Sequence, residues 1–119
     1  MHALIIEDEA LVAMSIEDAL RDCGCKSFDH ASTVEGAIAA ADHHMPDLIT
    51  ADVQLAPGCG IDAVEAICEL RRIPTFFITG TPAEVRTRLP THLVVNKPFS
   101  GHQIAAAVRH VMPQLPKAA

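Results

Sequence analysis

The chain has no tryptophan and no tyrosine, and it has only four phenylalanines. Single-stranded nucleic acids are held largely by aromatic side chains that stack on the bases, so few residues here suit that binding mode. Basic side chains are also scarce, because nine Lys and Arg stand against fifteen Asp and Glu, for a formal charge of −6. An acidic chain is repelled by nucleic-acid phosphates. We therefore expect no direct binding to nucleic acid.

Long apolar runs are absent as well. No run approaches the roughly 20 apolar residues with which a helix crosses a bilayer. No Lys or Arg precedes the first apolar segment, and Glu7 follows that segment at once, so the N-terminus does not resemble a secretory signal peptide. We expect no membrane segment and a cytoplasmic location.

The four cysteines are not arranged as a metal or redox motif. Cys23 and Cys25 are separated by one residue, and no CxxC pair occurs. Such spacing is typical of reduced thiols in a cytosolic protein rather than of a zinc or disulfide site. The neighbouring pair His43 and His44 receives no role from the sequence alone.

Two apolar spacings alternate along the chain. Short continuous apolar runs, typical of buried strands, are each followed by apolar residues spaced three and four apart, which is typical of helices. Ser32 with Glu35 and Ser100 with Gln103 have the spacing of helix capping boxes, and Gly24 is placed to end the first helix. The predicted strands cover residues 2–6, 26–31, 47–51, 74–78 and 92–95, and the predicted helices cover 10–23, 32–45, 61–71, 82–89 and 100–112.

Five strand-then-helix units predict one α/β domain over residues 1–113, with a parallel sheet covered on both faces and a frayed tail at 114–119. In such folds the binding site lies at the carboxyl ends of the strands. The polar residues expected there are the acids at 7–9, Asp52, Thr79 and Lys97.

Those residues favour a metal-assisted phosphoryl acceptor over a nucleotide or flavin site. A phosphate-binding turn would need Gly, Ser or Thr after the first strand, whereas acids occupy that place and would repel a phosphate. Clustered carboxylates suit Mg²⁺. The Asp52 carboxylate can attack phosphorus, while the Thr79 hydroxyl and the Lys97 ammonium stabilise the phosphoryl oxygens.

In this order and at these strand ends, the residues resemble the receiver domain of bacterial two-component response regulators over nearly the full chain. The motif residues are Glu7-Asp8, Asp52, Gly60, Thr79 and Lys97-Pro98-Phe99. The resemblance implies a flavodoxin-like fold with a doubly wound five-stranded sheet in the order 2-1-3-4-5. It also implies a cis Lys97–Pro98 bond.

The resemblance assigns a role to each site residue. Asp52 is expected to be the phosphoacceptor, and Thr79 and Lys97 are expected to hold phosphoryl oxygens. Mg²⁺ is expected to bind Asp8 and Asp52 directly, Glu7 mostly through water, and the backbone carbonyl of Gln54.

Two departures from the family pattern concern signal output. Val94 stands where the family usually has a switch aromatic, and Ala56 stands where it usually has proline. The segment 74–80 resembles the PFxFATGY motif of an alphaproteobacterial receiver subgroup, and 60–64 resembles receivers of general stress response regulators. The usual threonine–aromatic switch is therefore not expected.

The expected function is that of a single-domain response regulator, phosphorylated by a sensor histidine kinase or a histidine phosphotransfer protein in a phosphorelay. It is expected to act through protein contacts, as a monomer or a weak phosphorylation-dependent dimer. Two alternatives stay open, a phosphate-independent pseudo-receiver and a receiver fragment of a longer regulator. Enzymatic activity is not expected, because an aspartate-nucleophile hydrolase needs a second Asp where Gln54 stands and a cap domain.

Overall fold

The computed structural model describes residues 1–113. The predicted tail at 114–119 lies outside the described residues. Within the described part, no helix combines the length and the apolar character needed to cross a membrane. The strands and helices are, in chain order, β1 (His2–Ile6), α1 (Ala10–Asp22), β2 (Ser27–Ala31), α2 (Val34–His43), β3 (Leu48–Ala51), α3 (Gly60–Cys68), β4 (Thr75–Thr79), α4 (Pro82–Arg88), β5 (Leu93–Asn96) and α5 (Gly101–Val111).

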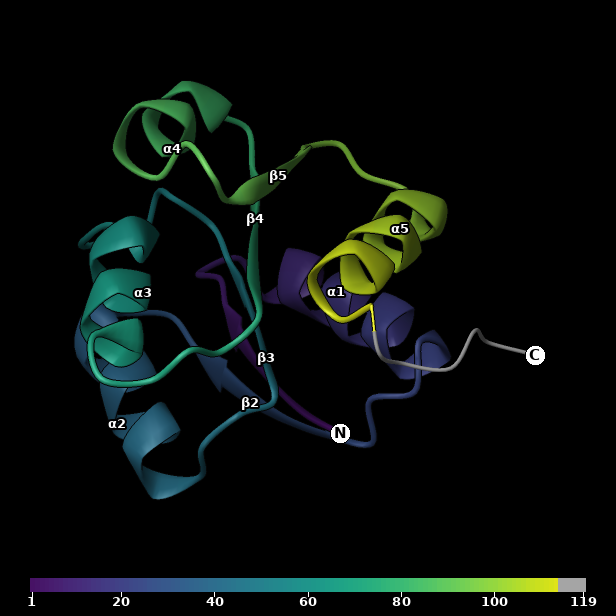
Figure 1. The fold of residues 1–119 in the computed structure, drawn as a ribbon, viewed down its shortest axis with the longest axis horizontal. Helices are drawn as coiled ribbons and strands as arrows, with labels where there is room; N and C mark the ends of the chain where they lie inside the picture. Colours follow the sequence, from purple (N-terminus) through teal and green to yellow (C-terminus); the bar gives the residue numbers. More distant parts are fainter. Residues whose placement is uncertain (114–119) are drawn as a thin grey trace.

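The five strands form one parallel sheet in the order β2-β1-β3-β4-β5, which confirms the doubly wound α/β fold predicted from the sequence. Figure 1 shows α1 and α5 together on one face of the sheet, and α2 and α3 on the other. From β1 the chain first adds β2 on one side and then crosses to add β3 on the other side. The point at which strand order reverses therefore lies between β1 and β3. The register pairs Ile6 with Ala51, so the carboxyl ends of β1 and β3 lie side by side.

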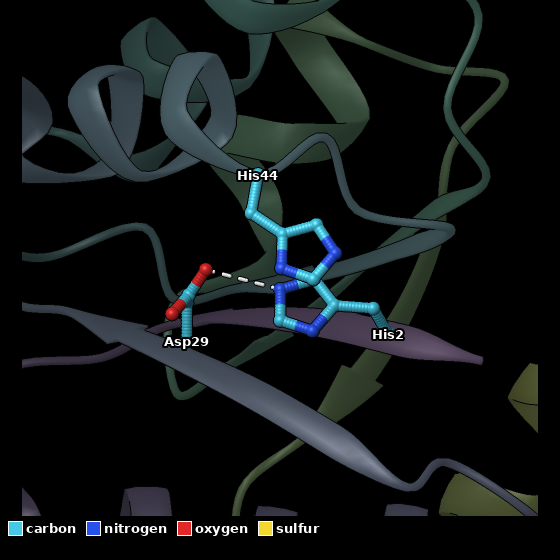
Figure 2. Close-up of side chains that lie close together, drawn as sticks. All are labelled: His2, Asp29 and His44. Atoms are coloured by element: carbon cyan, nitrogen blue, oxygen red, sulfur yellow. Dashed lines mark hydrogen bonds and ion pairs between the residues drawn. The ribbon is translucent and has the colours of Figure 1, made fainter.

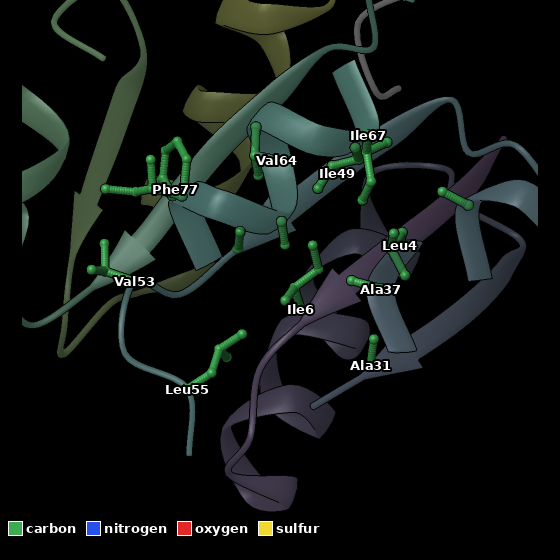
Figure 3. Close-up of a cluster of buried hydrophobic side chains, with 14 of the residues drawn as sticks. Leu4, Ile6, Ala31, Ala37, Ile49, Val53, Leu55, Val64, Ile67 and Phe77 are labelled. Carbon is green, nitrogen blue, oxygen red and sulfur yellow. The ribbon is translucent and has the colours of Figure 1, made fainter. Parts of the chain in front are cut away.

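Each face of the sheet carries its own apolar core. Alternate side chains of a strand point to opposite faces. Leu4 and Ile6 therefore pack with Phe77 beneath α2 and α3, a cluster drawn in Figure 3, while Ile5 packs with Phe76 beneath α1 and α5. The two neighbouring phenylalanines thus contribute to different cores.

Helix ends agree with the sequence in two places. Gly24 follows α1 with a φ of 102°, the left-handed conformation that glycine adopts without strain. The capping box predicted at the start of α5 is also present, since Ser100 Oγ accepts from the backbone N–H of Gln103 and the Gln103 side chain accepts from that of Ser100.

Two predicted helix ends are wrong. The N-cap of α2 is Thr33, whose side chain accepts from the Gly36 N–H, rather than Ser32 of the predicted capping box. Helix α3 ends at Cys68 instead of residue 71. Leu70, which falls within the predicted helix over 61–71, is 92% exposed. The chain bends after Cys68 to bring β4 alongside β3, and this long-range pairing overrides the local apolar pattern.

Candidate functional site

Three carboxylates meet at the carboxyl ends of β1 and β3. Glu7 and Asp8 directly follow β1, and Asp52 directly follows β3, so the parallel register brings them together. One carboxylate oxygen from each residue lies within 4.8 Å of the other two. Glu7 and Asp52 are buried, with 1% and 8% of their side chains exposed, whereas Asp8 is open to solvent.

Lys97 pairs with both buried carboxylates. It follows β5, and its Nζ donates to Glu7 Oε1 and to Asp52 Oδ2, each at 2.8 Å. Its backbone N–H donates to the carbonyl of Thr79 at 3.0 Å, and this hydrogen bond ties the chain just after β5 to the end of β4. The Lys97–Pro98 peptide bond is cis, as the family resemblance implies.

Burial and pairing shift two pKa values in this cluster. Burial raises the pKa of Glu7 above its ordinary value, and the hydrogen bond from Lys97 only partly offsets this effect. Burial alone would lower the pKa of Lys97, but its hydrogen bonds to Asp52 and Glu7 outweigh burial and raise that pKa. Lys97 therefore stays cationic throughout the physiological range.

The loop after β3 holds Asp52 in place. Asp52 Oδ1 accepts from the backbone N–H of Val53 at 2.7 Å. The Gly60 N–H donates to the Val53 carbonyl at 2.8 Å and closes the loop. A Cβ at Gly60 would overlap the backbone carbonyl of Asp52. Glycine is required there because the start of α3 packs directly on the backbone of the Asp52 loop.

A cleft of ≈ 440 Å³ opens beside the carboxylates, and Asp8, Asp52 and Gln54 are among the residues that line it. The bridge that closes the loop uses the Val53 and Gly58 carbonyls, so it does not use the carbonyl of Gln54. The cleft therefore offers the oxygen donors that Mg²⁺ prefers. Glu84 also lines this cleft and was not predicted from the sequence. It lies in α4, and the expectation that sites form at the carboxyl ends of strands does not locate residues within helices.

Thr79 is buried at the end of β4, on the strand next to β3. Its Oγ1 accepts from the Thr81 backbone N–H at 3.0 Å and lies 3.1 Å from the Thr81 hydroxyl. The structure thus brings Glu7, Asp52 and Lys97 into direct contact, whereas the Thr79 hydroxyl bonds within its own turn.

The sequence from residue 3 to 109 matches the family model described as the response regulator receiver domain. The chain belongs to this family. Receiver domains are in general non-enzymatic signalling domains, and they generally bind Mg²⁺ at an acidic pocket. The family match covers every residue of the site described above.

Two curated relatives place the chain among known receivers. It is 34% identical over 113 residues to the phyllosphere-induced regulator PhyR of Methylorubrum extorquens, covering 92% of this chain and 42% of that protein. It is 37% identical over 79 residues to the transcriptional regulatory protein PdtaR of Mycobacterium tuberculosis, covering 66% of this chain and 38% of that protein. The chain therefore spans less than half the length of either relative.

Solved structures support the same placement. The solution structure of the Erythrobacter litoralis PhyR receiver domain has a TM-score of 0.87 at 34% identity, covering 99% of this chain and 95% of that one. The crystal structure of the anti-anti-sigma factor PhyR from Bartonella quintana has a TM-score of 0.84 at 35% identity, covering 95% of this chain and 47% of that one. Both confirm the resemblance to receivers of stress response regulators.

Proposed function

We propose that this receiver accepts a phosphoryl group on Asp52, in a Mg²⁺-dependent reaction, from a sensor histidine kinase or a histidine phosphotransfer protein. The observation that carries the proposal is the contact of Lys97 with both Glu7 and Asp52 beside an open, oxygen-lined cleft. A buried pair of carboxylates with one lysine costs free energy to desolvate. Because Asp52 lines an open cleft rather than a sealed core, the arrangement suits phosphoryl transfer better than it suits stability.

In the proposed reaction the Asp52 carboxylate forms a bond to phosphorus while the bond from phosphorus to the donor histidine nitrogen breaks. Lys97 leaves its carboxylate partners and pairs with a phosphoryl oxygen. Asp8, Asp52 and the Gln54 carbonyl would hold Mg²⁺, with Glu7 acting through water. The ion would neutralise the negative charge that gathers on the phosphoryl oxygens.

The signal is proposed to leave through Thr79. A phosphoaspartate adds roughly −1.5 to −2 charges and three acceptor oxygens. If the Thr79 side chain rotates so that its hydroxyl donates to one of these oxygens, Thr79 Oγ1 moves away from the Thr81 N–H that donates to it, and the turn into α4 loses this hydrogen bond. Val94 is too small to act as a lever, so we propose a reordering of residues 79–90 in place of an aromatic switch.

Two wider settings are compatible with this chemistry. A single-domain regulator and a receiver segment of a longer regulator would use the same acceptor. The second setting is favoured by the length of the relatives, since the chain covers 47% of the Bartonella quintana anti-anti-sigma factor PhyR. In either setting, the proposed output is a protein contact of a monomer or weak dimer in the cytoplasm.

The test is the intact mass of the protein after incubation with acetyl phosphate and Mg²⁺. The expected result is a gain of one phosphoryl group, which is absent when EDTA replaces Mg²⁺ from the start of the incubation and absent in Asp52→Asn. Asp18→Asn is the matched control, because Asp18 is an exposed aspartate of α1. A mass gain that persists in Asp52→Asn refutes the acceptor assignment. If neither acetyl phosphate nor a histidine kinase adds mass to the wild type, the pseudo-receiver alternative is correct.

A further inference from the structure

A second group of potential metal ligands lies at the opposite end of the sheet from Asp52. His2 begins β1, Asp29 lies in β2, and His44 directly follows α2. One ligand atom from each of these residues lies within 4.8 Å of the other two. Figure 2 shows the His44 ring stacked over His2, with the Asp29 carboxylate beside a nitrogen of His2. None of these residues belongs to the phosphoacceptor site.

The His2 ring is held in one orientation. The residue is 6% exposed, with Nδ1 lying 2.7 Å from Ser27 Oγ and Nε2 lying 3.0 Å from Asp29 Oδ2. A carboxylate can only accept a hydrogen bond, so Nε2–H donates to Asp29 and the Ser27 hydroxyl donates to Nδ1 of the neutral ring. The backbone N–H of His2 donates to Asp47 Oδ2 at 2.7 Å. Two carboxylates therefore contact the same histidine.

His44 lies on the open side of this group. Its ring centroid is 3.7 Å from that of His2, and the two ring planes differ by 10°. The nitrogen lone pairs of two stacked rings lie in two nearly parallel planes, so the His44 ring must turn before both rings can face one ion. Because His44 is exposed, rotation about its side-chain bonds meets no packed core.

We propose that His2, Asp29 and His44 bind one divalent transition-metal ion of the zinc class. Zn²⁺ binds histidine nitrogen and carboxylate oxygen at about 2.0–2.2 Å, so two ligands of a tetrahedral ion lie about 3.3 Å apart. The 3.0 Å between His2 Nε2 and Asp29 Oδ2 is close to that separation without any movement of the backbone. Three protein ligands leave the fourth position to water.

The surroundings of His2 also suit a metal ligand. When Nε2 binds the ion, the ring proton moves to Nδ1, and the Ser27 hydroxyl turns to accept it. Metal-bound histidines are usually oriented by a hydrogen bond from the other ring nitrogen. Asp29 and Asp47 place two carboxylates at this group, and carboxylates attract a dication.

The ion preference of this site would differ from that of the acidic cleft. Imidazole nitrogen suits zinc and its neighbours, whereas carboxylate and carbonyl oxygens suit Mg²⁺. The bound ion would join the first residue of β1, the edge strand β2 and the end of α2, three segments far apart in sequence. The inference stands independently of phosphoryl transfer at Asp52.

Nearby thiols are poor competitors for the ion. Cys25 is buried, and burial raises its pKa to about 11, so it remains a thiol near neutral pH. Burial also raises the pKa of Cys23. The thiolate, not the thiol, is the metal ligand. Cys59, which lines the acidic cleft, is replaced by serine in every protein used for the test.

The test is calorimetric titration with Zn²⁺ in excess Mg²⁺, which occupies the acidic cleft. The expected result is one Zn²⁺ per chain, with affinity at least about tenfold weaker in His44→Gln, since loss of an outer partner alone costs 10- to 100-fold. His43→Gln is the matched control, because His43 is the adjacent exposed histidine outside the group, and its affinity is expected to equal that of the parent protein.

Asp29→Asn is expected to weaken binding as well, and imidazole ¹⁵N NMR should show Zn²⁺-dependent shifts at His2 and His44. His44 is exposed, so its variant tests binding without disturbing the core. Equal affinity in His44→Gln and the parent protein overturns the proposal. So does an equal loss in His43→Gln, or Zn²⁺-dependent amide shifts that are largest at residues 7–9 and 52–54.

Discussion

Replacing Lys97 with methionine removes the positive charge that faces Glu7 and Asp52 and keeps a side chain of similar length. The Lys97 Nζ lies 2.8 Å from an oxygen of each carboxylate. The lysine side chain is 21% exposed, whereas those of Glu7 and Asp52 are 1% and 8% exposed. The variant therefore leaves two desolvated carboxylates without a cation.

Removing one partner of a buried ion pair costs 3–5 kcal/mol in the free energy of unfolding, and the partial exposure of Lys97 favours the low end, about 3 kcal/mol. With a urea dependence of about 2 kcal/mol per molar, the denaturation midpoint should fall by about 1.5 M at pH 7 in EDTA. Added Mg²⁺ should restore part of this loss, because the ion supplies positive charge at the same carboxylates. Asp52→Asn in the Lys97→Met background should also restore part of it, by removing one of the two charges.

The pH dependence separates this explanation from a simple loss of packing. As the pH falls through the raised pKa of Glu7, that carboxylate takes up a proton and no longer needs a cation, so the stability difference between Lys97→Met and wild type should shrink. Lys26→Met, at an exposed lysine, should change stability by less than about 0.5 kcal/mol. A loss of less than about 1 kcal/mol in Lys97→Met, or a loss of the same size at pH 4 and pH 7, would refute the reasoning.

Three further predictions concern single residues. Gly60→Ala should lower the free energy of unfolding by about 1–3 kcal/mol in thermal denaturation, because its Cβ overlaps backbone, while Gly101→Ala, where a Cβ meets open space, should not. The raised pKa of Glu7 means that the folded state binds its proton more tightly than the unfolded state, so stability should fall as pH rises from 4.5 through the raised pKa. Glu7→Gln should flatten that part of the urea-denaturation profile, and an unchanged slope would contradict the assignment. Beryllofluoride should change amide dynamics at residues 80–90 in wild type but not in Thr79→Ala; a response confined to α1 or α5 would contradict the proposed output.

Much of the fold was predictable from local sequence. Buried parallel strands are continuous apolar runs, and surface helices repeat their apolar residues every three to four positions, so each element could be located without its neighbours. The start of α5 is set by Ser100 and Gln103, and the end of α1 by Gly24, which are local devices within one turn. The acids after β1, together with Asp52, could be assigned to one edge because parallel strands end on the same side.

Helix ends that depend on distant pairing were not predictable. The apolar pattern of α3 continues to Leu70, but β4 must pair with β3, and that pairing draws the chain away and leaves Leu70 exposed. The predicted N-cap of α2, Ser32, is one residue before the observed N-cap, Thr33, because serine and threonine are both capable N-caps. Their local chemistry does not distinguish them.

Only the tertiary structure decided which groups touch. The sequence places Thr79 and Lys97 at neighbouring strand ends, yet the structure pairs Lys97 with Glu7, 90 residues away, and leaves the Thr79 hydroxyl bonded within its own turn. The group formed by His2 and His44 shows the same principle, since no sequence spacing links a residue at the start of β1 with one after α2. Periodicity and caps act within a few residues, so the sequence by itself determined the elements and the edge that carries the site. Contacts between elements depend on the register of the whole sheet, which is set when distant apolar faces pack together.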